Sequence, residues 1–280
     1  MLLMSGATLL ITLFLRCALT EGFVELDPMF TDGAVLQMAP AHPAVWGRAS
    51  SSEVTLSLEG SAYPAARVPV GIDGRWTATL PPQAPSYNRT MEVSDGNLHA
   101  PTIAVLVSFG HVLLCSGQSN MAMAVGGPGV FHKPNKTAFA ADNGTAESAA
   151  SGRFTGKIWY REDTNDTYIG PKRVWRPVSP TTLPGFSAVC WYAGKSLFEQ
   201  AAHDAGHDVP LGLIAATWGA TPIEYWLPQT DPSDPNKNAC ETDEPQCVPR
   251  FPLRGNVSDS AFFEQYVRPL APYTVSALVW

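Results

Sequence analysis

The residues best suited to chemistry lie in one short stretch, CSGQSNMAM, from Cys115 to Met123. Ser119 follows an apolar run, Val112 to Cys115, and sits in a tight Gly-Gln-Ser setting. If that run is a central strand of a parallel sheet, Ser119 lies beyond its carboxyl end, where ligands bind in such sheets. Gly117 permits a tight turn, and residues 120–123 can open a helix whose positive end faces the serine. This setting stabilises the oxyanion that forms when a serine attacks an ester carbonyl, and it also fits an ordinary strand-to-helix turn.

The segments that must position Ser119 indicate an α/β domain over residues 108–280. Buried strands that alternate with helices form a parallel sheet covered on both faces. Within the longest helix-like stretch, apolar residues recur at helical spacing, with Ser187 as a cap and Gly206 at the end. The alternating segments are Val112 to Cys115, Ser187 to Ala205, Leu211 to Ala216, Asp259 to Leu270 and Val275 to Trp280.

Residues 21–107 have a different pattern, that of short strands separated by turn residues. Glu53 to Leu58 and Arg75 to Leu80 alternate polar and apolar side chains, which is the period of a half-buried strand. Strands that recur about every ten residues, with no helical period between them, predict a small β-sandwich or jelly-roll-like module.

The N-terminus and the charge indicate the compartment and exclude some partners. Residues 1–20 resemble a cleaved secretory signal peptide, because a short apolar run, Leu9 to Leu15, precedes Arg16. No later segment has ~18 uninterrupted apolar residues, so we expect no membrane span after cleavage. The chain has a formal net charge of −7, and loss of Arg16 makes it −8. An acidic chain without basic clusters argues against nucleic acid as a partner.

Cysteines and glycosylation sequons agree with the secretory pathway, and we expect a secreted or lysosomal protein. In an oxidising compartment Cys240 and Cys247 could close a small loop. Cys115 and Cys190 lie in apolar runs, so they are either buried free thiols or a disulfide. No Cys/His spacing matches a metal site, and we expect no cofactor. Five Asn-X-Ser/Thr sequons begin at Asn88, Asn135, Asn143, Asn165 and Asn256, and they mark exposed segments.

The block Cys115 to Met121 resembles the nucleophile block of the sialate O-acetylesterase family, within the larger group of SGNH-type hydrolases. Further blocks agree in order, from about residue 33 to the last residue. They are Val35 to Gln37, Val45 to Gly47, Gly74 to Trp76 with Leu80 to Pro82, Ser187 to Trp191, Leu211 to Ile214 and Trp218 to Glu224. The resemblance implies an N-terminal β-module followed by a flavodoxin-like hydrolase domain.

The same resemblance implies that Ser119 attacks the acetyl carbonyl of an O-acetylated sialic acid and gives an acetyl-enzyme, without a metal. The backbone N–H groups of Ser119 and Gly219 would form the oxyanion hole. Gln118 and Asn120 flank the nucleophile, and Glu224 and Trp226 would lie at the pocket wall. A solvated or capping carboxylate is the alternative for Glu224.

The sequence departs from the family pattern at three places. The family usually has an acidic residue where His111 stands, and Ala220 replaces the second glycine of its Trp-Gly-Gly-Thr-Pro block. The family's Asp-X-X-His segment, which supplies the general base and its partner, is not present in this chain. Because general-base help is worth ~10²- to 10⁴-fold, this absence bears directly on activity.

The six histidines are scattered, and each is expected to be a surface or structural residue. His111 should lie at the far end of the nucleophile strand, His203 and His207 end the long helix, and His42, His99 and His132 lie in loops. We therefore expect the hydrolase domain to be C-terminally incomplete, as in a partial gene model, a splice form or a fragment of a longer esterase.

Two other functions fit the same residues. One is a non-catalytic secreted protein whose β-module and remnant pocket bind a glycan without cleaving it. The other is an esterase that acts on a different acetylated carbohydrate, such as acetylated xylan. The oligomeric state is undetermined by the sequence.

Overall fold

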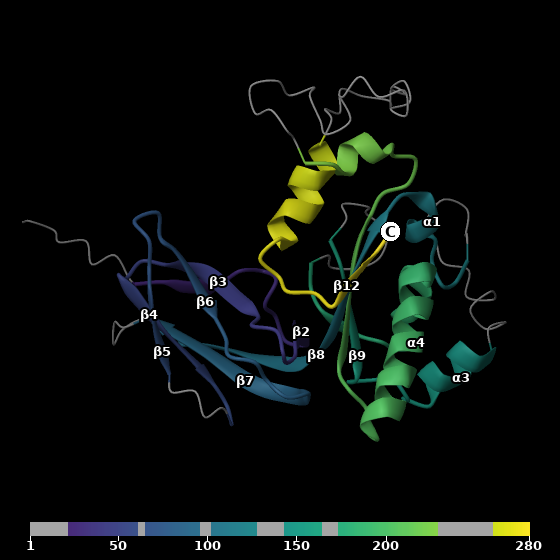
Figure 1. The fold of residues 1–280 in the computed structure, drawn as a ribbon, viewed down its shortest axis with the longest axis horizontal. Helices are drawn as coiled ribbons and strands as arrows, with labels where there is room; N and C mark the ends of the chain where they lie inside the picture. The colour runs from purple at the N-terminus through teal and green to yellow at the C-terminus, as the bar shows by residue number, and fades with distance from the viewer. Residues whose placement is uncertain (1–21, 61–64, 96–101, 128–142, 164–172, 229–259) are drawn as a thin grey trace, which may run out of the picture.

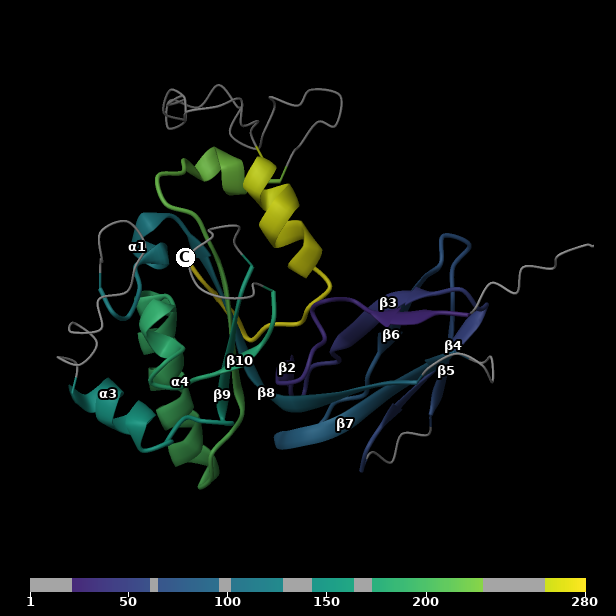
Figure 2. The same cartoon turned by 180° about the vertical axis from the view of Figure 1, so that it is seen from behind.

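The computed structural model describes residues 22–60, 65–95, 102–127, 143–163, 173–228 and 260–280. The N-terminal strands lie at one end of the molecule and helices α3 and α4 at the other (Figure 1). The long strand β8 lies between the two ends, as the view from behind also shows (Figure 2). Within the described ranges, every helix is too short or too polar to cross a bilayer.

Strand β8 (Ile103–Gly117) is long enough to pair with strands at both ends of the molecule. Its first half pairs antiparallel with β7 (Ser86–Asp95) and parallel with β2 (Ala34–Gln37). Its second half pairs parallel with β11 (Leu211–Thr217) and β12 (Ala277–Val279). The runs at 103–107 and 112–115 are therefore one strand, and the predicted domain boundary at residue 107 falls inside it.

A second feature of β8 is its glycine at position 110, which explains why the strand can continue there. A Cβ on Gly110 would lie 1.9 Å from the carbonyl oxygen of Pro210. The same carbonyl accepts the N–H of His111 at 2.9 Å. Only a residue without a side chain allows this close approach of the chain before β11.

The remaining N-terminal strands form two groups. β1 (Val24–Leu26), β3 (Ala44–Ala49) and β6 (Arg75–Thr79) make a three-stranded antiparallel sheet. β4 (Glu53–Leu58) and β5 (Ala66–Pro69) extend the nine-stranded sheet beyond β7. The predicted alternation is confirmed in β4 and β6, where every second side chain is buried and joins one hydrophobic core.

The other end of the nine-stranded sheet is mainly parallel. Its strand order is β10-β9-β11-β8, in which β9 (Ile158–Glu162) and β11 are parallel and β10 (Arg176–Pro177) is an antiparallel edge. The predicted long helix is confirmed as α4 (Ala188–Ala205), with Ser187 as its N-cap and Gly206 in the left-handed conformation at its end. The fold is thus a mixed α/β fold built on a mixed sheet.

Helices cover both faces of this parallel part. On one face, α4 packs its Cys190, Trp191 and Phe198 against alternate residues of β8 and β11. On the opposite face lie the 3-10 helix η2 (Ile223–Trp226) and the π-helix η3 (Phe263–Val267). Shorter helices are α1 (Ser119–Ala122), α3 (Asn143–Ala150), η1 (Leu183–Gly185) and η4 (Arg268–Leu270).

One expectation about the C-terminal region needs correction. The last segment is not a buried strand, because β12 pairs only with β8 among the described strands, and Leu278 and Trp280 are 59% and 57% exposed. The expected helix is present over residues 261–270, where two α-helical residues lead into the π-helix η3 and the 3-10 helix η4. Its Phe262 and Tyr266 are core residues, whereas Phe263 lies against the guanidinium of Arg268.

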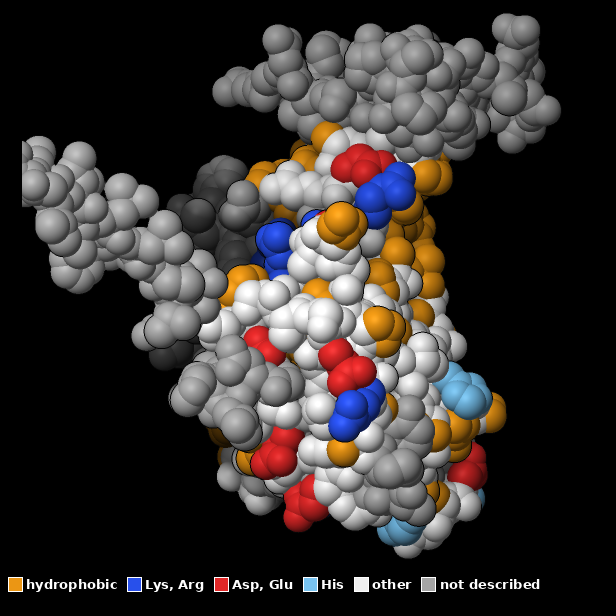
Figure 3. Space-filling view, turned by 90° about the vertical axis from the view of Figure 1, so that its left-hand side faces the viewer, with side chains coloured by type: hydrophobic (Ala, Val, Ile, Leu, Met, Phe, Trp, Pro, Cys, Tyr) orange, Lys and Arg blue, Asp and Glu red, His pale blue; other side chains and the backbone are white. Residues whose placement is uncertain are grey.

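Acidic and basic side chains are interspersed on the face shown in Figure 3. Neither sign forms a continuous patch there.

Candidate functional site

Ser119 lies immediately beyond the carboxyl end of β8. Gly117 ends the strand with a φ of 142°, in a conformation that favours glycine, and Ser119 is exposed at the start of α1. Gly219, just after β11, lies beside it, since a Cβ on Gly219 would be only 3.6 Å from the Ser119 Cβ. The N–H of Trp218 donates to the carbonyl of Gly117 at 3.0 Å and ties the two loops together. The structure thus brings Ser119 and Gly219 side by side.

Gln118 is the immediate partner of Ser119. Its Oε1 accepts hydrogen bonds from the Ser119 Oγ at 2.7 Å and from the Ser119 N–H at 3.0 Å. The amide predicted to serve in an oxyanion hole therefore already has an acceptor, which a substrate oxygen would have to displace. Because α1 has only one turn, it adds little helix dipole at this point. Asn120 is exposed on the same turn.

The N-terminus of α4 supports the turn that carries Ser119. The Oγ of Ser187 accepts the N–H of Cys190 at 3.1 Å, as a helix cap does, and donates to the carbonyl of Met121 at 2.6 Å. The Ala188 N–H donates to the carbonyl of Met123 at 2.7 Å. One serine side chain thus caps the helix and fixes the turn that carries Ser119.

A disulfide between Cys115 and Cys190 joins β8 to the first turn of α4, with a Cα–Cα distance of 5.8 Å. The sequence allowed either two buried free thiols or a disulfide at these positions, and the structure contains the disulfide. The other predicted pair, Cys240 with Cys247, lies outside the described residues.

The loop after β11 is held by a short hydrogen-bond chain. The Thr221 Oγ1 donates to the carbonyl of Trp218 at 2.8 Å and accepts the indole N–H of Trp226 at 2.9 Å. Between them, Ala220 has a φ of 59°, a left-handed conformation that alanine rarely adopts. Alanine at this position therefore strains the backbone of the loop.

Trp226, the aromatic residue expected near the pocket, is buried rather than exposed. Trp226 is only 5% exposed, because its ring packs against Phe262, Tyr266 and Trp280. Glu224 is partly exposed in η2, and its carbonyl accepts the N–H of Ser260 at 3.0 Å.

The described histidines lie away from Ser119. His111 pairs with Leu211 at the amino end of the parallel strands, about 20 Å from Gly117 at ~3.3 Å a residue. His203 and His207 lie at the far end of α4, and His42 precedes β3 in the N-terminal strands. His99 and His132 lie outside the described residues. In the part of the chain that the structure describes, no imidazole accompanies the serine, nor does any cluster of His, Cys, Asp and Glu suit a metal ion.

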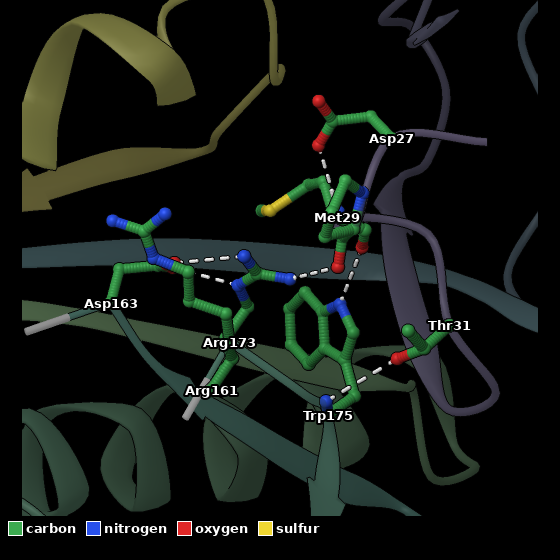
Figure 4. Close-up of polar contacts among 8 residues, drawn as sticks. Asp27, Met29, Thr31, Arg161, Asp163, Arg173 and Trp175 are labelled. Carbon is green, nitrogen blue, oxygen red and sulfur yellow. Dashed lines mark hydrogen bonds and ion pairs between the residues drawn. The ribbon is translucent and has the colours of Figure 1, made fainter. Parts of the chain in front are cut away.

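A buried ion pair at the end of β9 is the feature that sequence reasoning missed (Figure 4). The Nε and Nη2 of Arg161 donate to the two carboxylate oxygens of Asp163 at 2.7 and 2.8 Å, and both side chains are at most 5% exposed. The Arg161 Nη1 donates to the carbonyl of Pro28 at 2.5 Å, and the indole of Trp175 donates to the carbonyl of Met29 at 2.9 Å. These bonds attach the N-terminal strands to the parallel sheet.

The only hint of this pair in the sequence is two opposite charges at i and i+2. In a strand, such residues lie on the same face. Here that face is the one against the N-terminal segment, where Tyr273 also lies. The hydroxyl of Tyr273 donates to the carbonyl of Val35 at 2.6 Å, and burial raises the pKa of this tyrosine above its ordinary value.

Comparison with known proteins gives one consistent picture, although no protein-family model matches the chain. A sialate O-acetylesterase from Rattus norvegicus is 27% identical, in an alignment that covers 88% of this chain and 49% of the relative. A sialate O-acetylesterase from Homo sapiens is 26% identical, in an alignment that covers 88% of this chain and 46% of that protein. The chain therefore spans about half the length of these relatives.

A solved structure shares the fold. A carbohydrate acetylesterase from Xanthomonas citri superposes with a TM-score of 0.65 at 23% identity, covering 92% of this chain and 51% of that one. The predicted resemblance to sialate O-acetylesterases is thus confirmed at the level of sequence similarity, over most of this chain.

Proposed function

We propose that this chain hydrolyses O-acetyl esters of sialic acids with Ser119 as the nucleophile. The observation that carries the proposal is the position of Ser119 beside Gly219 at the carboxyl ends of two parallel strands. The similarity to sialate O-acetylesterases over 88% of the chain supports it. Similarity to these esterases supports acetyl-ester hydrolysis as the reaction class, and the geometry around Ser119 supports the choice of this serine as the nucleophile.

The proposed reaction has two steps. The Ser119 Oγ attacks the acetyl carbonyl carbon and loses its proton to a general base that the described residues do not supply. The same base then returns the proton to the sugar oxygen, which leaves as a hydroxyl group. Water then attacks the acetyl-enzyme and releases acetate. The N–H groups of Ser119 and Gly219 would stabilise the oxyanion, each worth about 3 kcal/mol on the scale of a single donor deletion. For this, the Gln118 amide oxygen must leave the Ser119 N–H.

The proposed architecture is a β-sandwich over residues 21–107 and an SGNH-type, flavodoxin-like domain over residues 108–280, after a signal peptide at residues 1–20. The core shared by the three-stranded sheet and the adjoining strands supports the first unit. The parallel strands with helices on both faces support the second. We also propose that the sequons carry N-linked glycans and that the protein is secreted or lysosomal.

Acetate release from a 9-O-acetylated sialic acid tests the proposal, with the 280-residue chain compared with its Ser119→Ala variant. We expect release that Ser119→Ala abolishes and that a matched exposed serine variant, Ser151→Ala in the turn after α3, retains. Equal acetate release by the unmodified chain and its Ser119→Ala variant would show that another residue is the nucleophile.

A binding protein without catalysis is the second candidate, and the absence of a described imidazole near Ser119 favours it. It predicts binding of the acetylated sugar without release of acetate. An esterase for another acetylated carbohydrate would instead release acetate from acetylated xylan faster than from the sialic acid.

A further inference from the structure

Arg173 is an exposed cation at the end of β9, and its ion-pair partner among the described residues is Asp163. Its partner Asp163 is already neutralised by the bidentate pair with buried Arg161. Arg173 reaches Asp163 only through its Nε, at 3.8 Å. The three side chains therefore carry one net positive charge, because two guanidinium groups share one carboxylate.

The side chain of Arg173 is accessible where Arg161 is not. Arg173 is 51% exposed, whereas the side chains of Arg161 and Asp163 are 3% and 5% exposed. Figure 4 shows the terminal nitrogens of Arg173 on the side of the ion pair away from Arg161. A guanidinium in this position can present its planar pair of N–H donors to an outside carboxylate.

The backbone holds Arg173 in an unusual conformation. Its φ is 60°, in the left-handed region that costs a non-glycine residue about 1 kcal/mol or more. Its N–H donates to the carbonyl of Glu162 at 3.0 Å, which fixes the residue at the end of β9. Strain of this kind is found where surrounding structure imposes it, and functional sites are common examples.

The position relative to Ser119 suits a sugar that lies across the carboxyl ends of the strands. The Asp163 N–H donates to the carbonyl of Ala215, and Ala216 pairs with Ser116, three residues before Ser119. β9 lies two strands from β8, or about 10 Å at ~4.8 Å a strand. A monosaccharide with its acetyl group at Ser119 can therefore extend towards Arg173.

From these observations we infer that Arg173 is a binding residue for a carboxylate on the acetylated sugar. The inference rests on the proposed function and assigns a residue to the carboxylate of its substrate. Sialic acids carry such a carboxylate, and neutral acetylated sugars such as those of xylan do not.

Binding to an inactive chain tests the inference without requiring catalysis. In the Ser119→Ala background, saturation-transfer NMR titrations would compare 9-O-acetylated sialic acid with its methyl ester, which lacks the charge. We expect the acid to bind at least ~10-fold more tightly, Arg173→Gln to remove that difference, and Arg173→Lys to keep part of it. Arg67→Gln, which removes an exposed charge from β5, is the matched control and should keep the difference.

Equal binding of acid and ester, undetectable binding of the acid, or an unchanged preference in Arg173→Gln would overturn the inference. Thermal unfolding of each variant would identify a simple loss of folding, which lowers the binding of acid and ester alike. Carboxylate-dependent binding without Ser119-dependent acetate release would refute the proposed function alone. Acetate release that is indifferent to Arg173 would refute the carboxylate site alone.

Discussion

Cys115, in the last part of β8, is bonded to Cys190 in the first turn of α4, across 75 residues of sequence. Ser119 lies four residues after Cys115, and the cap of α4 holds the turn that begins at Ser119, through the carbonyl of Met121. The covalent link therefore fixes the strand that presents Ser119 against the helix that supports its turn.

Removing this disulfide should destabilise the protein by about 2–5 kcal/mol. The Cys115→Ala/Cys190→Ala variant should show the loss in urea unfolding. In the wild-type protein, alkylation under denaturing, non-reducing conditions should label neither cysteine. A double variant as stable as the wild type would contradict this role.

The Ala220→Gly substitution should stabilise the protein by up to about 1 kcal/mol. Alanine at a φ of 59° is strained by ~1–2 kcal/mol, and glycine removes this strain. Glycine also increases the conformational entropy of the unfolded chain, which costs ~0.4–1 kcal/mol of stability, so the relief of strain is the larger effect. The matched control is Ala202→Gly in the interior of α4, where glycine should cost about 1 kcal/mol. Thermal unfolding of both variants measures the opposite signs, and destabilisation by Ala220→Gly would refute the strain.

Much of the fold follows from local sequence patterns. The period of β4 and β6, the caps of α4 and the buried run of β11 each indicate an element that the structure contains. The juxtaposition of Ser119 and Gly219 could also be expected, because both follow strands that end at the same edge of a parallel sheet.

Other features depend on contacts distant in sequence and could not be predicted in this way. β9 contains a buried arginine, which becomes compatible with burial only through Asp163 and the carbonyl of Pro28. Trp226 is buried by aromatic residues of the segment 262–280 rather than by its neighbours in sequence. Hydrophobic periodicity and composition do not reveal contacts between residues that are distant in sequence.

His111 should make the stability depend on pH. Burial lowers the pKa of His111 from its ordinary value of 6.5, so the unfolded chain binds this proton more tightly than the folded chain does. Stability should therefore be fully present above pH 6.5 and should fall as pH decreases through 6.5 towards the lower folded pKa. The His111→Gln variant should show less of this dependence in urea midpoints measured from pH 5 to 8. The variant of an exposed histidine, His207→Gln, should retain it.

Breaking the Arg161–Asp163 pair from one side should be costly. Arg161→Met leaves the buried Asp163 carboxylate with only the distant Arg173 and should cost about 3–5 kcal/mol. The double variant Arg161→Met/Asp163→Leu buries no unpaired charge and should recover part of that loss. A double-mutant cycle by chemical denaturation measures the coupling, and purely additive losses would contradict it.

Asn88 should carry a glycan when the chain passes through the secretory pathway. It is exposed at an irregularity in the pairing of β7 with β8, and its φ of 48° is one that asparagine tolerates better than most residues. Asn88→Asp keeps a residue suited to this conformation and removes the acceptor. The intact mass should fall by one glycan in that variant, and peptide-N-glycosidase treatment should bring both proteins to nearly the same mass. An unchanged mass would show that Asn88 is not occupied.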